Sequence, residues 1–542
     1  MFRLISRITR PGKKRHNNST RPQERCKVAP SEEKRQVAAG LEQNKKIVHE
    51  VFDRCADLVV REFLIGRVNP VRAMAVFLDP LVNRDLMSEF LAHPLMEVDR
   101  VPPAGVTLDW LKERVVTAGS ILEKRRWVEA GNGIAKGLVA LFVDGQSRVI
   151  LLDIPEVTSR AISQPISEQT LRGSADAFNE DRRTNLALLR KRLRSTRLAV
   201  ENLELGTVTK NVVSIVYLKG YADGGLVDEV KTRLRRIEID GILNSEQVTE
   251  FIQDSPYSLF SGVGTTERPD IIAANLLEGR VGLILGNTPY ALFVPATLGV
   301  FMQTPDDYSN RYWYGSFIRL LRWAGLFIAL LMPGFYIAVL SFHQEMVPTV
   351  LFTTIMADRE GVPFPIFVEA LIMELAFEML REAGVRLPRP FGQTISIVGA
   401  IVIGQAAVSA RLVSTGMVVV VALTAVASYT VATIPLASVV RLLRFIFMFA
   451  GSGFGLFGVT AAMSLLTFHL CALRSFGVPY LSPAAPLSPD ILRDTLVRVP
   501  VWMMRRRPRF LNPKDPVRQP AGHKPHPPAG RISGRRRKKG GR

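Results

Sequence analysis

Three glutamates stand in one of the most apolar stretches of this chain, and they raise the first question about its chemistry. The stretch is "REGVPFPIFVEALIMELAFEMLREAG", residues 359–384, and it holds Glu369, Glu374 and Glu378. A carboxylate at the centre of a bilayer costs about 2.5–3.5 kcal/mol, whereas each apolar neighbour recovers only about 0.3–0.6 kcal/mol. The sequence therefore argues against a lone helix that faces lipid.

Two interpretations of these carboxylates remain open. Glu374 and Glu378 are four residues apart and share one helical face, whereas Glu369 lies about 140–180° around the helix. The stretch is either an amphipathic helix at the membrane interface, with its acids in water or paired with Arg381, or part of an assembly whose acids face a polar cavity or cation path. Gln405 either joins helices by hydrogen bonds or belongs to the same polar path.

Long apolar segments predict the membrane helices that would position these side chains. Four segments approach or exceed the length that crosses ~30 Å of hydrocarbon. They are residues 324–342, 393–410, 416–438 and 445–473, and 362–380 is expected to form an amphipathic or re-entrant helix. The glycines of "GSGFGLFG" have dinucleotide-motif spacing, but they lie inside an apolar segment, which favours close helix packing or a break in a long span.

The charge of the chain is concentrated at its two ends. The 542 residues carry a net charge of +21, of which +9 falls in residues 1–47 and +13 in residues 481–542. Both tails are expected to be disordered and to contact anionic lipid, and no specific nucleic acid is expected. Three scattered cysteines predict no disulfide framework, and because the first residues lack the continuous apolar core of a signal peptide, we expect the N-terminal half to stay in the cytoplasm.

The basic residues give conflicting evidence on orientation. Two basic tails favour an even number of crossings with both ends inside. Four crossings would, however, place five arginines in outside loops: Arg381, Arg386, Arg389, Arg441 and Arg444. A fifth span at 362–380 would bring these loops inside but send the basic C-tail outside. The tails carry more charge, so we expect both to lie inside.

The first half of the chain predicts soluble α/β structure. Short β-rich runs alternate with helical patterns. Residues 75–90 align without gaps on 215–230, an offset of 140, and 136–151 align on 278–293, an offset of 142. These matches predict two tandem, duplicated subdomains. We place them at residues 48–165 and 166–310, followed by a polytopic α-helical membrane domain over 311–480.

Motifs for catalysis and metal binding are weak throughout the sequence. The seven histidines show no ligand spacing, and "GNGIAKG" (131–137) lacks the Lys-Ser/Thr pair of a phosphate loop. "TTERPD" (265–270) is typical of an ion-paired turn between subdomain elements. We therefore predict no enzyme activity, no cofactor and no metal.

Several long motifs resemble the A subunit of the spore germination receptors, the GerA family. They include "FNEDRRTNLALLRKRLRS" (178–195), "TTERPDIIAANLLEGRV" (265–281), "PDDYSNRYWYGSFIRLLRW" (305–323), "REGVPFPIFVEALIMELAFEMLREAG" and "ISIVGAIVIGQAAVSARLVS" (395–414). The resemblance runs from about residue 130 to 480. It implies a multi-pass protein of the spore inner membrane that works with a transporter-like B subunit and a lipoprotein C subunit, oligomerises, and lines a nutrient-gated ion-conducting pore.

The resemblance also implies which residues carry structural or coupling roles. The matching positions are Glu180, Asn185, Arg190, Arg192, Glu267, Arg268, Pro269, Asp270, Asp307, Tyr308, Arg319, Arg322, Pro363, Pro365, Glu369, Glu374, Glu378, Arg381 and Gln405. The chain departs from the family at 172–178, where a Pro-Arg-Glu-Gly core is missing, at 285–289, and at Arg411. The leading hypothesis is a receptor and channel subunit, and a secondary transporter or a non-conducting scaffold are the alternatives.

Overall fold

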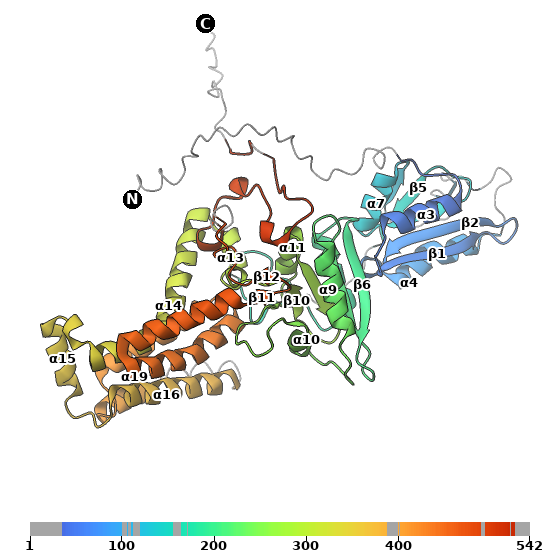
Figure 1. Ribbon diagram of the computed structural model, residues 1–542. Helices are drawn as coiled ribbons and strands as arrows, with labels where there is room; N and C mark the ends of the chain where they lie inside the picture. The colour runs from blue at the N-terminus through green and yellow to red at the C-terminus, as the bar shows by residue number, and fades with distance from the viewer. Residues whose placement is uncertain are drawn as a thin grey trace, which may run out of the picture.

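The computed structural model describes residues 35–99, 106, 110–111, 120–154, 164–170, 172–386, 399, 402–488, 494–520 and 522–525. Two α/β units lie at one end of the molecule and a bundle of helices lies at the other (Figure 1). The predicted order of an α/β half followed by a helical half is confirmed. The N-terminal tail up to residue 34 lies outside the described residues.

The first α/β subdomain contains a five-stranded antiparallel sheet in the order β1-β2-β4-β5-β3. Its strands are β1 (Leu58–Ile65), β2 (Val71–Leu78), β3 (Ile121–Lys124), β4 (Val139–Val143) and β5 (Val149–Leu152). Its helices are α3 (Leu41–Val51), η1 (Asp79–Leu81), α4 (Arg84–Met87), η2 (Ser88–Ala92), α5 (His93–Met96) and α7 (Trp127–Ala135). The central strand β4 is buried at every position, as expected of a strand covered on both faces.

The second α/β subdomain repeats this topology, with the strand order β6-β7-β9-β10-β8. Its strands are β6 (Leu198–Leu205), β7 (Asn211–Leu218), β8 (Gly264–Thr266), β9 (Val281–Leu285) and β10 (Ala291–Val294). Its helices are α8 (Arg182–Arg192), α9 (Gly224–Arg235), α10 (Ser245–Ile252) and α11 (Pro269–Glu278). Strand β7 begins 140 residues after β2 (211 − 71), and β9 begins 142 after β4 (281 − 139). The predicted duplication is confirmed at the register that the sequence repeat indicated.

A buried ion pair joins the two subdomains. Arg190 of α8 donates to both carboxylate oxygens of Asp57, over 2.9 and 2.8 Å, and both side chains are buried. Backbone hydrogen bonds beside this pair link Ala56 and Arg54 to Val200 of β6. Arg190 therefore holds the two α/β subdomains together, since a bidentate ion pair fixes both the distance and the angle between the two side chains.

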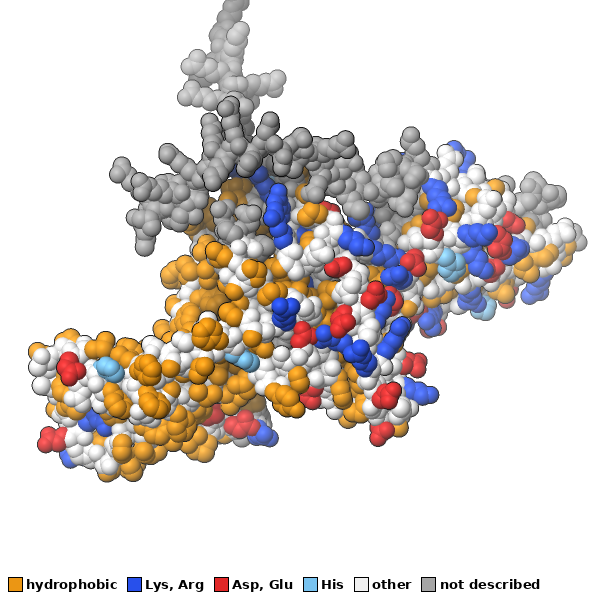
Figure 2. All heavy atoms as spheres, viewed as in Figure 1, with side chains coloured by type: hydrophobic (Ala, Val, Ile, Leu, Met, Phe, Trp, Pro, Cys, Tyr) orange, Lys and Arg blue, Asp and Glu red, His pale blue; other side chains and the backbone are white. Residues whose placement is uncertain are grey.

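Two short helices, α12 (Leu298–Phe301) and α13 (Pro305–Ser309), end the second α/β subdomain and lead into the helical half. The longer elements are α14 (Tyr312–Phe342), η3 (Gln344–Met346), α15 (Thr349–Arg359), α16 (Ile366–Arg386), helical residues 402–409, α18 (Thr415–Tyr429) and α19 (Ile434–Ala472). Among the described residues, α14 and α19 are long and apolar enough to cross a membrane, and α18 is a shorter apolar helix. Hydrophobic side chains cover most of the visible surface of this half (Figure 2).

Helix α19 is a hairpin rather than a single straight rod. Gly455 breaks it with φ 62° and ψ −145°, a conformation open almost only to glycine. Thr433, just before its first arm, donates to the carbonyl of Phe301, and His469, near the end of its second arm, lies 3.0 Å from Ser258. Both ends therefore touch the second α/β subdomain. The turn lies beside Phe342, at the other end of α14.

The helix boundaries differ from those predicted. The segment 416–438 is interrupted between α18 and α19, where Thr433 is the N-cap and a proline occupies the first turn of the new helix. Arg441 and Arg444, which we expected in a loop, lie inside the first arm of α19. Part of the predicted span 393–410 lies outside the described residues.

The C-terminal segment also differs from the expected disordered tail. After the two-stranded sheet β11 (Arg474–Ser475) and β12 (Val478–Pro479), residues 494–520 run back over the α/β half, with η4 (Val501–Met503) and η5 (Arg509–Leu511). Arg507 donates to the carbonyl of Leu277 and stacks over Tyr221 at 4.2 Å. The basic residues of this segment thus find backbone and aromatic partners on the folded domain, and residues 526–542 lie outside the described part.

Candidate functional site in the helical half and its junction

Helix α16 places its three carboxylates against neighbouring helices. Glu369 is fully buried, accepts hydrogen bonds from the backbone and hydroxyl of Ser414, and lies 3.6 Å from the Arg359 guanidinium. Ser414 is also the N-cap of α18, because its hydroxyl oxygen accepts a hydrogen bond from the backbone of Met417. Glu369 therefore ties the start of α16 to the start of α18 and the end of α15.

The second carboxylate forms a buried ion pair with α19. Arg444 donates from Nη1 to Glu374 Oε2 over 2.5 Å, and both side chains are almost fully buried. The Nε of Arg444 donates to the carbonyl of Ala329 in α14 over 2.9 Å. This pair therefore joins three helices. Glu374 Oε1 and Arg444 Nη2 are buried without a hydrogen-bond partner in the described part of the chain.

The third carboxylate lies nearer the surface. Glu378 is 39% exposed and accepts from Arg441 over 2.6 Å. Arg381 lies 3.9 Å from the same carboxylate, and its guanidinium stacks at 4.7 Å on the ring of Tyr429. The three glutamates and their arginine and serine partners lie along α16 in two groups, Glu369 toward α15 and α18 and the other two toward α19, and we call them together the α16 seam.

The α16 seam is more fully paired than either open interpretation supposed. The partners Arg359, Arg441 and Arg444 come from the same chain, whereas the sequence suggested only Arg381. The signal that could have found them is an arginine at 441 and again at 444, one helical turn apart inside an apolar stretch. Gln405 is exposed on its helix and, among the described residues, forms no hydrogen bond with the seam.

A second buried charge cluster lies where the α/β half meets α14. Asp307 of α13 accepts from Arg319 over 3.0 Å and from Arg322 over 3.1 and 3.2 Å, and all three side chains are buried. Arg322 also donates to the carbonyl of Met302 and to Thr304. The three predicted motif residues Asp307, Arg319 and Arg322 are thus brought together at the start of the long helix.

The C-terminal segment closes this cluster. Asp494 accepts from Tyr308 over 3.0 Å, and its carboxylate lies 3.4 Å from Arg319. Burial raises the pKa of Asp494 to about 6, although the Arg319 guanidinium acts in the opposite direction. Arg498 donates to the carbonyl of Asn310. We call Asp307, Arg319, Arg322 and Asp494 the junction cluster.

The "TTERPD" motif fastens the segment that links the two subdomains. Arg268 is fully buried, pairs in a bidentate manner with Asp270, and donates to the carbonyls of Glu168 and Ser174. Glu267 accepts from Ser167 and from the backbone of Glu168. Burial alone would raise the pKa of Glu267, but these hydrogen bonds hold it below its ordinary value. The motif is an ion-paired turn, as its composition indicated.

The remaining motif residues have local roles. The side-chain amide of Asn185 donates to the carbonyl of Asn179 and accepts from its backbone, which shapes the start of α8. Glu180 has an exposed side chain, and its carbonyl accepts from Asn287. Where the family core is missing, Arg192 pairs with Asp176 over 2.5 Å.

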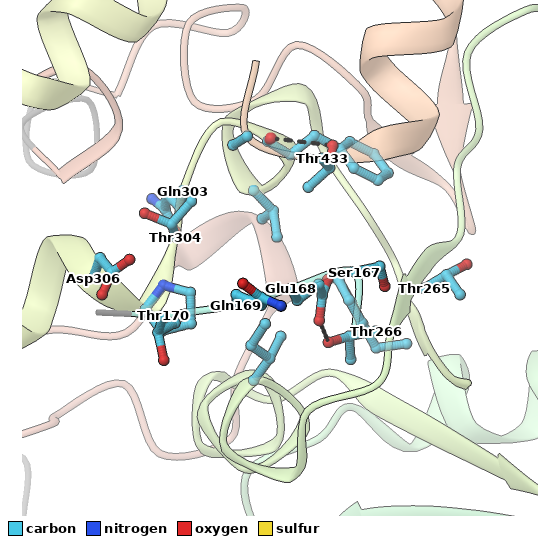
Figure 3. A pocket seen from close by; sticks show the side chains of 16 residues that line it. Ser167, Glu168, Gln169, Thr170, Thr265, Thr266, Gln303, Thr304, Asp306 and Thr433 are labelled. Atoms are coloured by element: carbon cyan, nitrogen blue, oxygen red, sulfur yellow. Dashed lines mark hydrogen bonds between the residues drawn. The ribbon is translucent and has the colours of Figure 1, made fainter. Parts of the chain in front are cut away.

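A cavity of about 140 Å³ lies beside this motif (Figure 3). Glu168 points into it, and the hydroxyl of Thr266 donates to one of its carboxylate oxygens. Burial raises the pKa of Glu168 to about 7.

The raised pKa of Glu168 makes a prediction about stability and pH. Because the folded state holds this proton more tightly than the unfolded state, ionisation destabilises the fold as pH rises from about 4.5 to 7. We therefore expect Glu168→Gln to increase the free energy of unfolding at pH 8 by up to about 3 kcal/mol, which is measured as a higher melting temperature. At pH 4 the melting temperature should change little. The exposed control Glu250→Gln should show no such difference. An equal effect of Glu168→Gln at both pH values would contradict this expectation.

Comparisons with known proteins identify relatives along most of the chain. The family model described as Bacillus/Clostridium GerA spore germination protein matches residues 46–510. Spore germination protein KA of Bacillus subtilis (strain 168) is 38% identical over 495 residues, covering 91% of each chain. Spore germination protein A1 of the same strain is 40% identical over 414 residues, covering 76% of this chain and 85% of the relative. The crystal structure of the N-terminal domain of the A subunit of the Bacillus megaterium spore germinant receptor GerK3 is 29% identical, with a TM-score of 0.38, covering 48% of this chain and 97% of that domain.

Proposed function

Because this chain belongs to the GerA family of spore germination proteins, we propose that it is the A subunit of a germinant receptor in the spore inner membrane. In this proposal it triggers germination as part of a complex with a transporter-like B subunit and a lipoprotein C subunit. The α/β half lies in the cytoplasm and the helical half crosses the membrane. The observation that carries the mechanism is the α16 seam.

The direction of each helix supports a six-crossing arrangement. Along α14, Gly325 lies beside Thr430 and Tyr336 beside Gly416, so α18 runs antiparallel to α14. The pairs Glu374–Arg444 and Glu378–Arg441 make α16 antiparallel to the first arm of α19. Gly399 lies beside Leu380, and Arg411 lies beside Gly361, so helical residues 402–409 run away from the α/β half.

Six crossings would reconcile the conflicting basic residues. The traverses would be α14, α16, the segment that contains helical residues 402–409, α18 and the two arms of α19. Because α19 crosses twice, the chain returns to the α/β side before its C-terminal segment, and Arg381 and Arg386 also fall on that side. Both basic ends then lie inside, as the positive-inside rule favours. The 21 residues of α16 would span about 31 Å.

The α16 seam suggests how the bundle would conduct ions. Buried ion pairs are expensive in a bilayer and are retained where charge or polarity serves a function. We propose that oligomerisation places α16 next to a neighbouring copy, and that nutrient binding shifts the bundle between a state with closed pairs and a state in which the carboxylates line a cation path. Glu378, the most exposed of the three, would be the first to meet a passing cation.

The proposal predicts the effect of neutralising Glu378. In spores carrying Glu378→Gln, we expect assembled receptor at normal levels but germinant-triggered cation release slowed several-fold, because a carboxylate along the path is lost. Cation release from spores after germinant addition, with receptor quantified by immunoblot, measures this. Glu374→Gln alone would strand Arg444, so Glu374→Gln should be paired with Arg444→Met.

Glu382→Gln is the matched control. Glu382 lies one turn further along α16 and pairs only with exposed Arg386 among the described residues, over 2.7 Å. Spores carrying Glu382→Gln should release cations as fast as wild-type spores. Unchanged kinetics in Glu378→Gln would remove this residue from the path. Counterflow of a labelled nutrient through vesicles holding the chain alone would instead favour a transporter, and oligomers without conductance would favour a scaffold.

A further inference from the structure

The cavity beside Glu168 lies where the second α/β subdomain meets the helical bundle (Figure 3). Its wall comes from six parts of the chain: residues 167–170, strand β8, Ile271 of α11, Phe293 of β10, residues 300–306, and residues 432–433 before α19. A ligand in this cavity would touch both halves of the protein at once. At about 140 Å³ the cavity is several times the ~30 Å³ that one water molecule occupies in the liquid.

The lining has the chemistry of a site for a cation. Two carboxylates, Glu168 and Asp306, contribute to the wall, together with the hydroxyls of Thr170, Thr304 and Thr433. Among the sixteen described residues that line the cavity, none is lysine, arginine or histidine. Apolar side chains, including Ile271, complete the wall. An anionic ligand would meet uncompensated negative charge, whereas a cation with a short organic body would match both surfaces.

We propose that this cavity binds a small organic ammonium ion, with the Glu168 carboxylate as its counter-ion. The Glu168 carboxylate accepts from the hydroxyl of Thr266 and from the backbone of Glu267, and no cationic side chain lines the cavity beside it. A primary ammonium group offers three donors, which suits one carboxylate surrounded by threonine hydroxyls. This site is separate from the α16 seam and does not depend on conduction.

The charged side chains nearest Glu168 do not prevent it from acting as the counter-ion of a bound ammonium group. Arg268 is the nearest cation, but its guanidinium is taken by Asp270 and by the carbonyls of Glu168 and Ser174. Glu267 stands on the other side, held by Ser167. Its negative charge raises the pKa of Glu168, while Arg268 lowers it. A bound ammonium ion would stabilise the ionised Glu168 carboxylate, which burial disfavours.

Occupancy of the cavity would act on the contact between the two halves. Thr433 lines the cavity and donates to the carbonyl of Phe301, just before the first arm of α19. A ligand that contacts Thr433 and Glu168 together would favour the arrangement in which this contact is closed. The site is therefore placed to bias the position of the α19 hairpin relative to the α/β half.

Isothermal titration of the full chain in detergent micelles tests the assignment. The probe is ethanolamine hydrochloride at pH 8, compared with ethylene glycol and with sodium glycolate, which are close in size but neutral and anionic. We expect saturable heat with ethanolamine alone. Glu168→Gln should weaken this binding by at least about tenfold, because it removes a charge-assisted hydrogen bond. At pH 6 the wild type should also bind more weakly, since more of the carboxylate is protonated.

Two further variants keep the test decisive. Ile271→Phe adds volume to the wall without changing charge and should abolish binding, which tests the cavity independently of the charge of Glu168. Glu250→Gln, an exposed glutamate on α10, should bind as the wild type does. No saturable binding of ethanolamine, equal binding of ethylene glycol, or unchanged binding in both cavity variants would overturn the proposal. Because the readout is binding, a failed Glu378→Gln experiment would leave it intact.

Discussion

Replacing Asp307 with asparagine is expected to separate the two halves of this protein. Asp307 is buried and is the shared acceptor for Arg319 and Arg322 in the junction cluster. The amide keeps the shape of the side chain but removes its charge, so two buried guanidinium groups lose their counter-ion. Breaking a buried pair by removing one partner costs about 3–5 kcal/mol. Asp494 lies 3.4 Å from Arg319 and compensates only that arginine.

The measurement is thermal unfolding of the detergent-extracted full chain together with limited proteolysis. We expect the melting temperature to fall by several degrees and cleavage to increase in the connection 303–311, because the contacts that hold α13 against α14 weaken. Asp306→Asn is the matched control, since the neighbouring carboxylate accepts only a long hydrogen bond, 3.5 Å from the backbone of Arg172, among the described residues. Equal stability of the two variants would show that the junction cluster does not hold the halves together.

Replacing Gly334 with leucine is expected to prevent the helical half from assembling. Helices α14 and α19 approach so closely here that a Cβ added at Gly334 would lie 2.6 Å from the carbonyl oxygen of Phe447. A Cβ added at Gly451 would likewise lie 2.5 Å from the carbonyl oxygen of Gly334. The obstacle is backbone, which no rotamer change can relieve, and close backbone contact at small residues is a main source of helix association in membranes. The expected loss exceeds the about 1–3 kcal/mol typical of overpacking.

Size-exclusion chromatography of the extracted protein gives the readout. Gly334→Leu should yield little monodisperse protein, and trypsin should cut within the helical half. The control is Gly453→Leu, which places the same side chain on the first arm of α19, where no heavy atom lies within 4 Å of the added Cβ. Normal yield of both variants would mean that the two helices do not pack as closely as this interface requires.

The α/β half was predictable because its information is local and repeated. The offsets of 140 and 142 residues found in the sequence are those that separate β2 from β7 and β4 from β9. Each strand also carries its own burial pattern, so periodicity and turn residues suffice. The helical half was less predictable. A continuous apolar run does not show where a helix ends, and the turns at 430–433 and Gly455 lie inside such runs.

The sequence identifies the glutamates of the candidate site but not the arginines with which they pair. The three glutamates of α16 were identified from their cost in an apolar stretch, yet two of their partners, Arg441 and Arg444, were assigned to a loop. Their pairing depends on a helix that starts 48 residues after α16 ends (434 − 386), which no local pattern encodes. Asp494 was missed for a similar reason, because a basic, proline-rich tail has the composition of disorder. The tail is ordered by donors on the folded domain that bind Asp494 and by carbonyls there that accept from Arg498 and Arg507.

The position of Asp494 in the chain sets the order in which the molecule can be completed. This residue leaves the ribosome after every helix of the bundle, so the α19 hairpin has already been synthesised when Asp494 reaches Arg319 and Tyr308. The helices of the bundle are therefore synthesised before the C-terminal segment that contacts them. A chain that ends before residue 494 would carry every helix of the bundle but lack the contacts through which the C-terminal segment joins that bundle to the α/β half.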